Sequence, residues 1–111
     1  MSEPKERFRV LLRMRIRPGM ESDFEKTWLR VGDAVTADPA NRGQWLMASQ
    51  DEPGVYYIVS DWTDEAGFRT FERSAEHVEH RKRLHPYRID GSMVTSRIVY
   101  HLEPAHAGED T

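Results

Sequence analysis

The chain has 111 residues, of which 38% are hydrophobic and 32% charged, a length that suits one domain with one modest core. Its 16 basic and 19 acidic residues are mixed along the sequence and leave a formal net charge of −3, which argues against nucleic acid as a partner. The absence of cysteine excludes disulfides, thiolate metal sites, iron–sulfur clusters and a cysteine nucleophile.

The beginning of the chain predicts a tail followed by a strand. Residues 1–6 carry no apolar signal core and no 18-residue apolar run occurs, so we expect a soluble cytoplasmic protein with no membrane partner. From Phe8 to Ile16 every even position is apolar, with arginines at most of the odd ones, which is the period of a strand with one buried face. We place the domain at residues 7–102 and expect flexible tails at 1–6 and 103–111.

An amphipathic helix is expected after the turn at Pro18-Gly19. Ser22 and Glu25 have the spacing of a capping box, which predicts where the helix starts. Apolar residues then recur at helical spacing, at Phe24, Trp28, Val31 and Val35. This helix should cover the apolar face of the first strand.

The middle of the chain predicts a hairpin. After a loop at 38–43, residues 44–50 and 55–62 are expected as strands joined by a four-residue connection. In the strand at 55–62, side chains alternate between two faces. One face carries Tyr56, Ile58, Ser60 and Trp62, and the other carries Val55, Tyr57, Val59 and Asp61. Because both faces carry bulky residues, neither should be left in water.

A second helical region and a last strand complete the pattern. Thr63 is expected to cap a helix whose two phenylalanines face inward, and Ser74 to mark a kink or restart. A loop through residues 90–91 should lead to a final strand at 93–102, which is rich in β-branched residues.

The order β-α-β-β-α-β predicts an α+β, ferredoxin-like fold, with a four-stranded antiparallel sheet and both helices on one face. The other face would carry Leu11, Tyr57 and Val59 and needs a cover. A second copy packed back to back would supply it, so we expect a homodimer. By alternation, Arg13 and Arg15 point to the same interface.

Two runs carry a family resemblance, namely RMRIRPG at 13–19 and YYIVSDWTDE at 56–65. On these motifs, and over about residues 8–102, the sequence resembles the antibiotic biosynthesis monooxygenase family. The resemblance implies a dimeric α+β barrel, in agreement with the element order. The family it resembles includes cofactor-independent oxygenases of polycyclic aromatic polyketides, small quinol monooxygenases, heme-degrading enzymes and proteins of no known activity, so fold alone does not decide the reaction.

The resemblance also points to particular positions. In the quinone-forming members a tryptophan and two asparagines share the pocket; Trp62 matches the tryptophan, whereas Leu12 and Ile58 occupy the asparagine positions. The site positions of the heme-degrading members correspond to Leu12, Phe71 and Arg81. His80 lies one residue before the last of these. Stabilisation of a substrate anion is therefore left without an assigned residue.

Trp62, His77 and His80 are the candidate catalytic residues. The indole of Trp62 could stack on a planar substrate and offer one N–H, or it could only plug the core. Either histidine could act as a general base towards a phenol or an anthrone carbon, or both could be solvated on a charged helix. A metal site formed by His77, Glu79 and His80 is not expected, because their side chains lie on more than one face of the helix.

The expected substrate contacts lie between the sheet and the helices, at Leu12, Met14, Trp28, Tyr56, Ile58, Phe71 and Arg81. Tyr87 and His101 are expected to close the ends of this pocket. With no dinucleotide-binding glycine fingerprint, no thiolate and no clear metal set, we expect no cofactor.

The predicted function is that of a cofactor-independent monooxygenase of secondary metabolism. A phenol or anthrone of aromatic polyketide type, once deprotonated, can reduce dioxygen directly, while the protein stabilises the anion and excludes water. Two alternatives stay open at this stage. One is an aromatic polyketide cyclase on the same fold, and the other is a non-catalytic dimer that binds a small molecule or serves as a scaffold.

Overall fold

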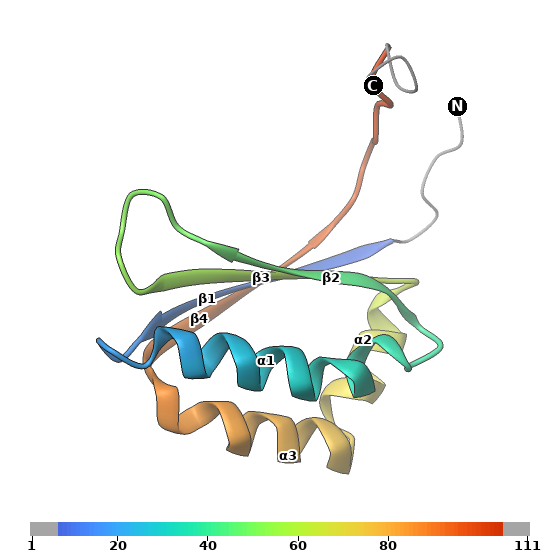
Figure 1. Ribbon diagram of the computed structural model, residues 1–111. Coiled ribbons are helices and arrows are strands. Elements are labelled where there is room, and N and C mark those ends of the chain that lie inside the picture. The colour runs from blue at the N-terminus through green and yellow to red at the C-terminus, as the bar shows by residue number, and fades with distance from the viewer. Residues whose placement is uncertain (1–6, 106–111) are drawn as a thin grey trace.

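Strands and helices follow one another in the predicted order (Figure 1). The computed structural model describes residues 7–105. The expected N-terminal tail at 1–6 and residues 106–111 of the expected C-terminal tail lie outside the described residues. The elements are β1 (Phe8–Ile16), α1 (Glu21–Thr36), β2 (Asn41–Ala48), β3 (Val55–Trp62), α2 (Glu65–Glu72), α3 (Ala75–Leu84), a 3₁₀ turn (His85–Tyr87) and β4 (Arg88–Arg97).

The four strands form one antiparallel sheet in the order β2-β3-β1-β4. In the register of the two central strands, Leu12 lies opposite Ile58, and Met14 lies opposite Tyr56. All four residues are therefore on one side of the sheet, as their alternation predicted. The α+β, ferredoxin-like arrangement expected from the sequence is confirmed.

All three helices lie on the same side of the sheet, with α1 running along it and α3 beside α1 (Figure 1). Between helices and sheet, two clusters of buried side chains form the core. One contains Phe8, Val10, Trp62, Phe68 and Phe71. The other contains Met14, Ile16, Phe24, Tyr56 and Ile58. None of the described helices has the length and apolar composition required to cross a bilayer.

The helix starts differ in part from the predicted ones. α1 begins at Glu21, and its N-cap residue Met20 makes no side-chain capping bond, so the expected capping box at Ser22 is wrong. α2 is capped by Asp64 rather than Thr63, because the extended backbone at Asp64 lets its carboxylate accept a hydrogen bond from the Gly67 amide at 2.7 Å.

The predicted restart at Ser74 is confirmed. Its hydroxyl oxygen accepts a hydrogen bond from the His77 amide at 3.2 Å, which caps the start of α3. The same hydroxyl lies 2.7 Å from the Phe71 carbonyl oxygen, to which it donates at the end of α2. The Ser74 side chain thus caps both the end of α2 and the start of α3.

The last strand lies earlier in the chain than predicted. β4 starts at Arg88, and the supposed loop residues Asp90 and Gly91 pair with Arg15 and Met14 of β1. Pairing with a complete neighbouring strand outweighs the turn preference of an Asp-Gly pair, because it satisfies the backbone groups of both residues. β2 likewise begins before residue 44, at Asn41, with an irregularity before Gly43.

The sheet side that the helices do not cover, here called the open face, carries an apolar row. Trp45, Val59, Leu11 and Val94 lie opposite one another across β2, β3, β1 and β4. Trp45 is 48% exposed and Val94 57% exposed. A row of this kind crossing a whole sheet is unusual for a surface that faces water.

Candidate functional site

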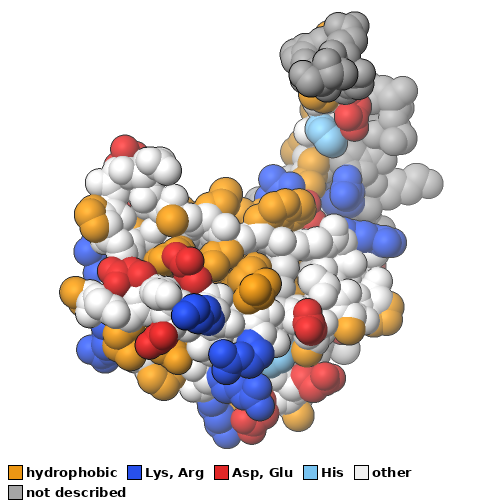
Figure 2. Space-filling model, in the orientation of Figure 1, with side chains coloured by type: hydrophobic (Ala, Val, Ile, Leu, Met, Phe, Trp, Pro, Cys, Tyr) orange, Lys and Arg blue, Asp and Glu red, His pale blue; other side chains and the backbone are white. Residues whose placement is uncertain are grey.

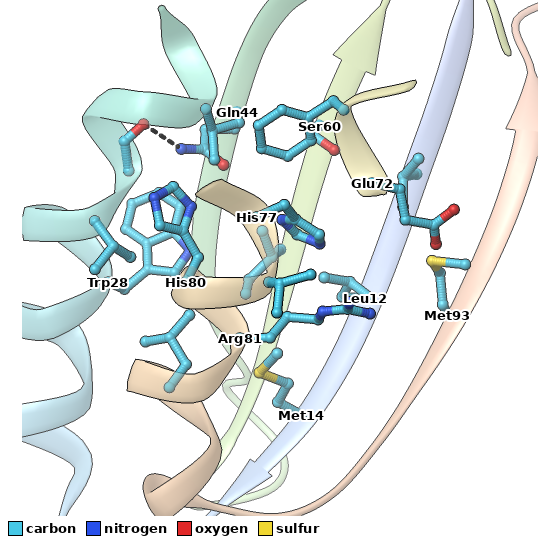
Figure 3. Close-up of a pocket in the computed structure, with 18 of the residues that line it drawn as sticks. Leu12, Met14, Trp28, Gln44, Ser60, Glu72, His77, His80, Arg81 and Met93 are labelled. Carbon is cyan, nitrogen blue, oxygen red and sulfur yellow. Dashed lines mark hydrogen bonds between the residues drawn. The ribbon is translucent and has the colours of Figure 1, made fainter. Parts of the chain in front are cut away.

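A cavity of about 560 Å³ lies between the helices and the sheet (Figure 3). Nine of the predicted site residues line it, namely Leu12, Met14, Trp28, Ile58, Trp62, Phe71, His77, His80 and Arg81. They come from β1, β3 and all three helices, so the cavity depends on the packing of the whole domain. Its volume is in the range that accommodates a small organic ligand of several rings.

Trp62 is the last residue of β3 and lines the cavity. It is only 1% exposed, and its ring packs against Phe68 and Phe71 at centroid distances of 5.5 and 5.0 Å. Its indole Nε1–H donates a hydrogen bond to the Ser60 hydroxyl oxygen at 2.9 Å. The N–H considered above as a donor to substrate is therefore already used within the protein.

Ser60 and Gln44 supply polar groups that the sequence analysis did not single out. They lie opposite each other on β3 and β2, and both line the cavity (Figure 3). The Gln44 side-chain amide donates to the Gly32 carbonyl oxygen at 3.3 Å. Because Ser60 accepts from Trp62, its own hydroxyl hydrogen is left for another acceptor. Its position two residues before Trp62, on the same face, was the available sequence signal.

His77 and His80 lie on the side of α3 that faces the cavity (Figure 3). Their ring centroids are 6.4 Å apart, and both Nδ1 atoms are buried with no hydrogen-bond partner among the described residues. Burial, assisted by the charge of Arg81, lowers the pKa of His77 to about 4, and burial likewise lowers the pKa of His80. His77 is therefore a neutral proton acceptor at pH 7.

Three other predicted pocket residues lie elsewhere. Tyr56 is buried against Phe24, its hydroxyl donates to the Glu25 carboxylate, and burial raises its pKa, as does that hydrogen bond. Tyr87 also packs against Phe24, and His101 is exposed. None of these three residues lines the cavity. The part of the chain that the structure describes contains no group of three metal-ligating side chains.

The model of the family described as Antibiotic biosynthesis monooxygenase matches residues 7–83. The chain belongs to the antibiotic biosynthesis monooxygenase family. It is 32% identical over 81 residues to Protein SchA of Streptomyces halstedii, covering 73% of this chain and 21% of that protein. It is 30% identical over 73 residues to a 42.8 kDa protein in the whiE locus of Streptomyces coelicolor, covering 66% and 18%. The chain thus spans about a fifth of these curated relatives.

Solved structures share the fold of this antibiotic biosynthesis monooxygenase family member at low identity. SnoaB from Streptomyces nogalater, described as a cofactor-independent oxygenase, matches with a TM-score of 0.80 and 17% identity, covering 89% of this chain and 99% of SnoaB. A conserved protein from Methanosarcina mazei matches with a TM-score of 0.76 and 14% identity, covering 82% and 91%. At these identities the likeness concerns the fold.

Leu12 and Ile58, which correspond to the two asparagine positions of the quinone-forming members, both line the cavity. Their side chains cannot donate a hydrogen bond to a ligand. The polar groups of the cavity wall lie at other positions, which include Ser60 and the two histidines of α3.

Proposed function

We propose that this member of the antibiotic biosynthesis monooxygenase family is a cofactor-independent monooxygenase of a planar, electron-rich aromatic compound, a phenol or anthrone of secondary metabolism. The observation that carries the proposal is the cavity itself. Its wall is mainly apolar and aromatic, and two buried imidazole nitrogens in it have no partner among the described residues. Such a site holds a flat molecule and offers an acceptor for its acidic proton.

Each polar group has a role in this proposal. His77 or His80 accepts the proton of the substrate, and a neutral imidazole is the form required. The imidazolium that results lies beside the new anion, and their attraction offsets the cost of burying the charge. The free hydroxyl hydrogen of Ser60 is available to donate to an oxygen on which negative charge develops. Trp28 supplies aromatic area against the ring system.

For an anthrone the reaction balances without a further reactant. The C–H bond at the methylene carbon breaks, and its proton goes to the imidazole. The carbanion reduces dioxygen in one-electron steps, and a C–O bond forms. The imidazolium returns the proton to the resulting peroxide; the O–O bond then breaks and the second hydrogen leaves that carbon. One oxygen atom remains as a carbonyl, and the other departs as water.

Turnover of dithranol, a hydroxylated anthrone, under ¹⁸O₂ tests the proposal. We expect one labelled oxygen per product and a rate above spontaneous oxidation. His77→Asn and His80→Asn should identify the base, the effective one lowering the rate about 10²-fold or more. His101→Asn is the matched control, because His101 is exposed and outside the cavity. Binding without turnover, or a product without the label, would contradict the proposal.

We also propose that the working unit is a homodimer through the open face. The row formed by Trp45, Val59, Leu11 and Val94 would be buried by a second copy, as would the neighbouring Tyr57. Burying an apolar side chain of this size contributes about 1.5 to 3 kcal/mol. Several such residues on one flat face support a stable sheet-to-sheet interface.

A further inference from the structure

The residues that line the cavity carry a net positive charge, whereas the whole chain carries a net negative charge. Arg81, Lys82 and Arg88 line the cavity together with one carboxylate, Glu72, whereas the whole chain carries a formal net charge of −3. Counting only Lys, Arg, Asp and Glu, these residues carry two positive charges in excess. Figure 2 shows a group of Lys and Arg side chains over α3, next to a histidine. An anion is therefore attracted to this part of the surface.

Two of the three cations have no counter-ion among the described residues. Lys82 lies 3.8 Å from Glu79, and Glu72 accepts a hydrogen bond from Arg69 at 3.1 Å. In contrast, no carboxylate of residues 7–105 lies within 4.0 Å of the Arg81 or Arg88 guanidinium, and neither side chain donates a hydrogen bond to another described residue. Their donors remain open to a ligand.

Both guanidinium groups lie on the helix-covered side of the sheet. Arg88 opens β4, and a Cβ built at Gly91 would be 3.2 Å from its Nη1, so the side chain folds over Gly91, which pairs with Met14 of the cavity wall. Arg81 extends from α3 toward Leu12 of β1 (Figure 3). One of the two cations thus comes from a helix and the other from the edge strand.

We propose that the ligand carries a permanent anionic group, a carboxylate, which Arg81 and Arg88 bind while its ring system lies against the aromatic wall. This inference rests on the proposed function, whose substrate class it narrows. Two guanidinium forks match the oxygens of a carboxylate, and charged hydrogen bonds of this kind are about twice as strong as neutral ones. The group also fixes which end of a flat ring system enters the cavity.

A pair of probes that differ only in charge tests the inference. Anthraquinone-2-carboxylate and anthraquinone-2-carboxamide share one planar ring system, and neither has a phenolic hydroxyl that could ionise. Quenching of Trp28 and Trp62 fluorescence would measure both affinities, since both residues line the cavity. We expect the carboxylate to bind about tenfold more tightly than the amide. Arg81→Gln and Arg88→Gln should each remove most of that preference and leave amide binding unchanged.

Arg83→Gln is the matched control, because Arg83 is exposed on α3 two residues from Arg81 but does not line the cavity. It should retain the preference, and Arg81→Lys should retain part of it. Equal affinity of the two probes for the unmodified protein would overturn the anionic site while leaving the cavity as a site for planar ligands. An equal loss in Arg83→Gln would overturn it in favour of diffuse surface charge. If neither probe binds, the proposed function fails as well.

Discussion

Trp62 is held in the cavity wall by one hydrogen bond as well as by packing. Trp62→Phe removes the indole donor and leaves a void, and Ser60→Ala removes the acceptor and leaves a buried N–H unpaired. Each change should lower the free energy of unfolding by about 1 to 3 kcal/mol. Since both break the same bond, the double variant should be less destabilised than the sum by about 0.5 to 1.5 kcal/mol. Chemical denaturation measures this, and strict additivity would contradict it.

His77 links stability to pH. Its pKa of about 4 in the folded protein lies below its ordinary value of 6.5, chiefly because of burial. Between these values the unfolded chain binds more protons, so stability should fall as the pH decreases from about 6.5 to 4. Because the ring is only partly buried, we expect His77 to account for about 1 to 2 kcal/mol of this loss. His77→Asn should flatten the profile of unfolding free energy against pH, and an unchanged slope would refute the assignment.

At the scale of the element, α3 depends on Ser74. It carries His77, His80 and Arg81 into the cavity wall, and its first turn is capped by the Ser74 hydroxyl. Ser74→Ala should cost about 1 kcal/mol of stability, and it should weaken binding of a planar probe because the cavity wall frays. Ser22→Ala is the control, since Ser22 makes no capping bond and should change stability by less than about 0.5 kcal/mol. Equal thermal shifts for the two variants would contradict this role.

Whole-molecule assembly is tested by two charge-introducing substitutions on opposite sides of the domain. Val59→Asp places a carboxylate between Trp45 and Leu11 of the open face and should weaken the proposed dimer by about thirtyfold or more, because burying a charge among apolar side chains costs at least ~2 kcal/mol. Leu29→Asp introduces a carboxylate on α1, where Leu29 is 70% exposed and lies away from the open face. This change should leave the dimer intact. Sedimentation analysis over a concentration series measures both. A monomeric parent protein would remove the basis for the interface.

The element order and the faces of the strands were predictable because each depends on local periodicity. Alternation from Phe8 to Ile16 and in the third strand fixes which side chains face the helices whatever else the chain does. Helix ends and strand limits were less predictable. Whether Ser22 caps a helix, or Asp90 turns the chain, depends on backbone geometry and on pairing with β1, which come from distant residues.

By itself the sequence determined the fold, the two faces of the sheet and nine of the residues that line the cavity, because burial follows the period of each element. Only the tertiary structure decided what those residues do there. In the structure the Trp62 N–H donates to Ser60, and the His77 and His80 Nδ1 atoms have no partner among the described residues. Tyr56 contacts Glu25 and lies away from the cavity. The tertiary structure also placed Arg88 at the cavity, through a strand register that sequence periodicity did not predict. Periodicity assigns a side chain to a face, whereas hydrogen bonds, charges and cavities depend on distances between residues far apart in the chain.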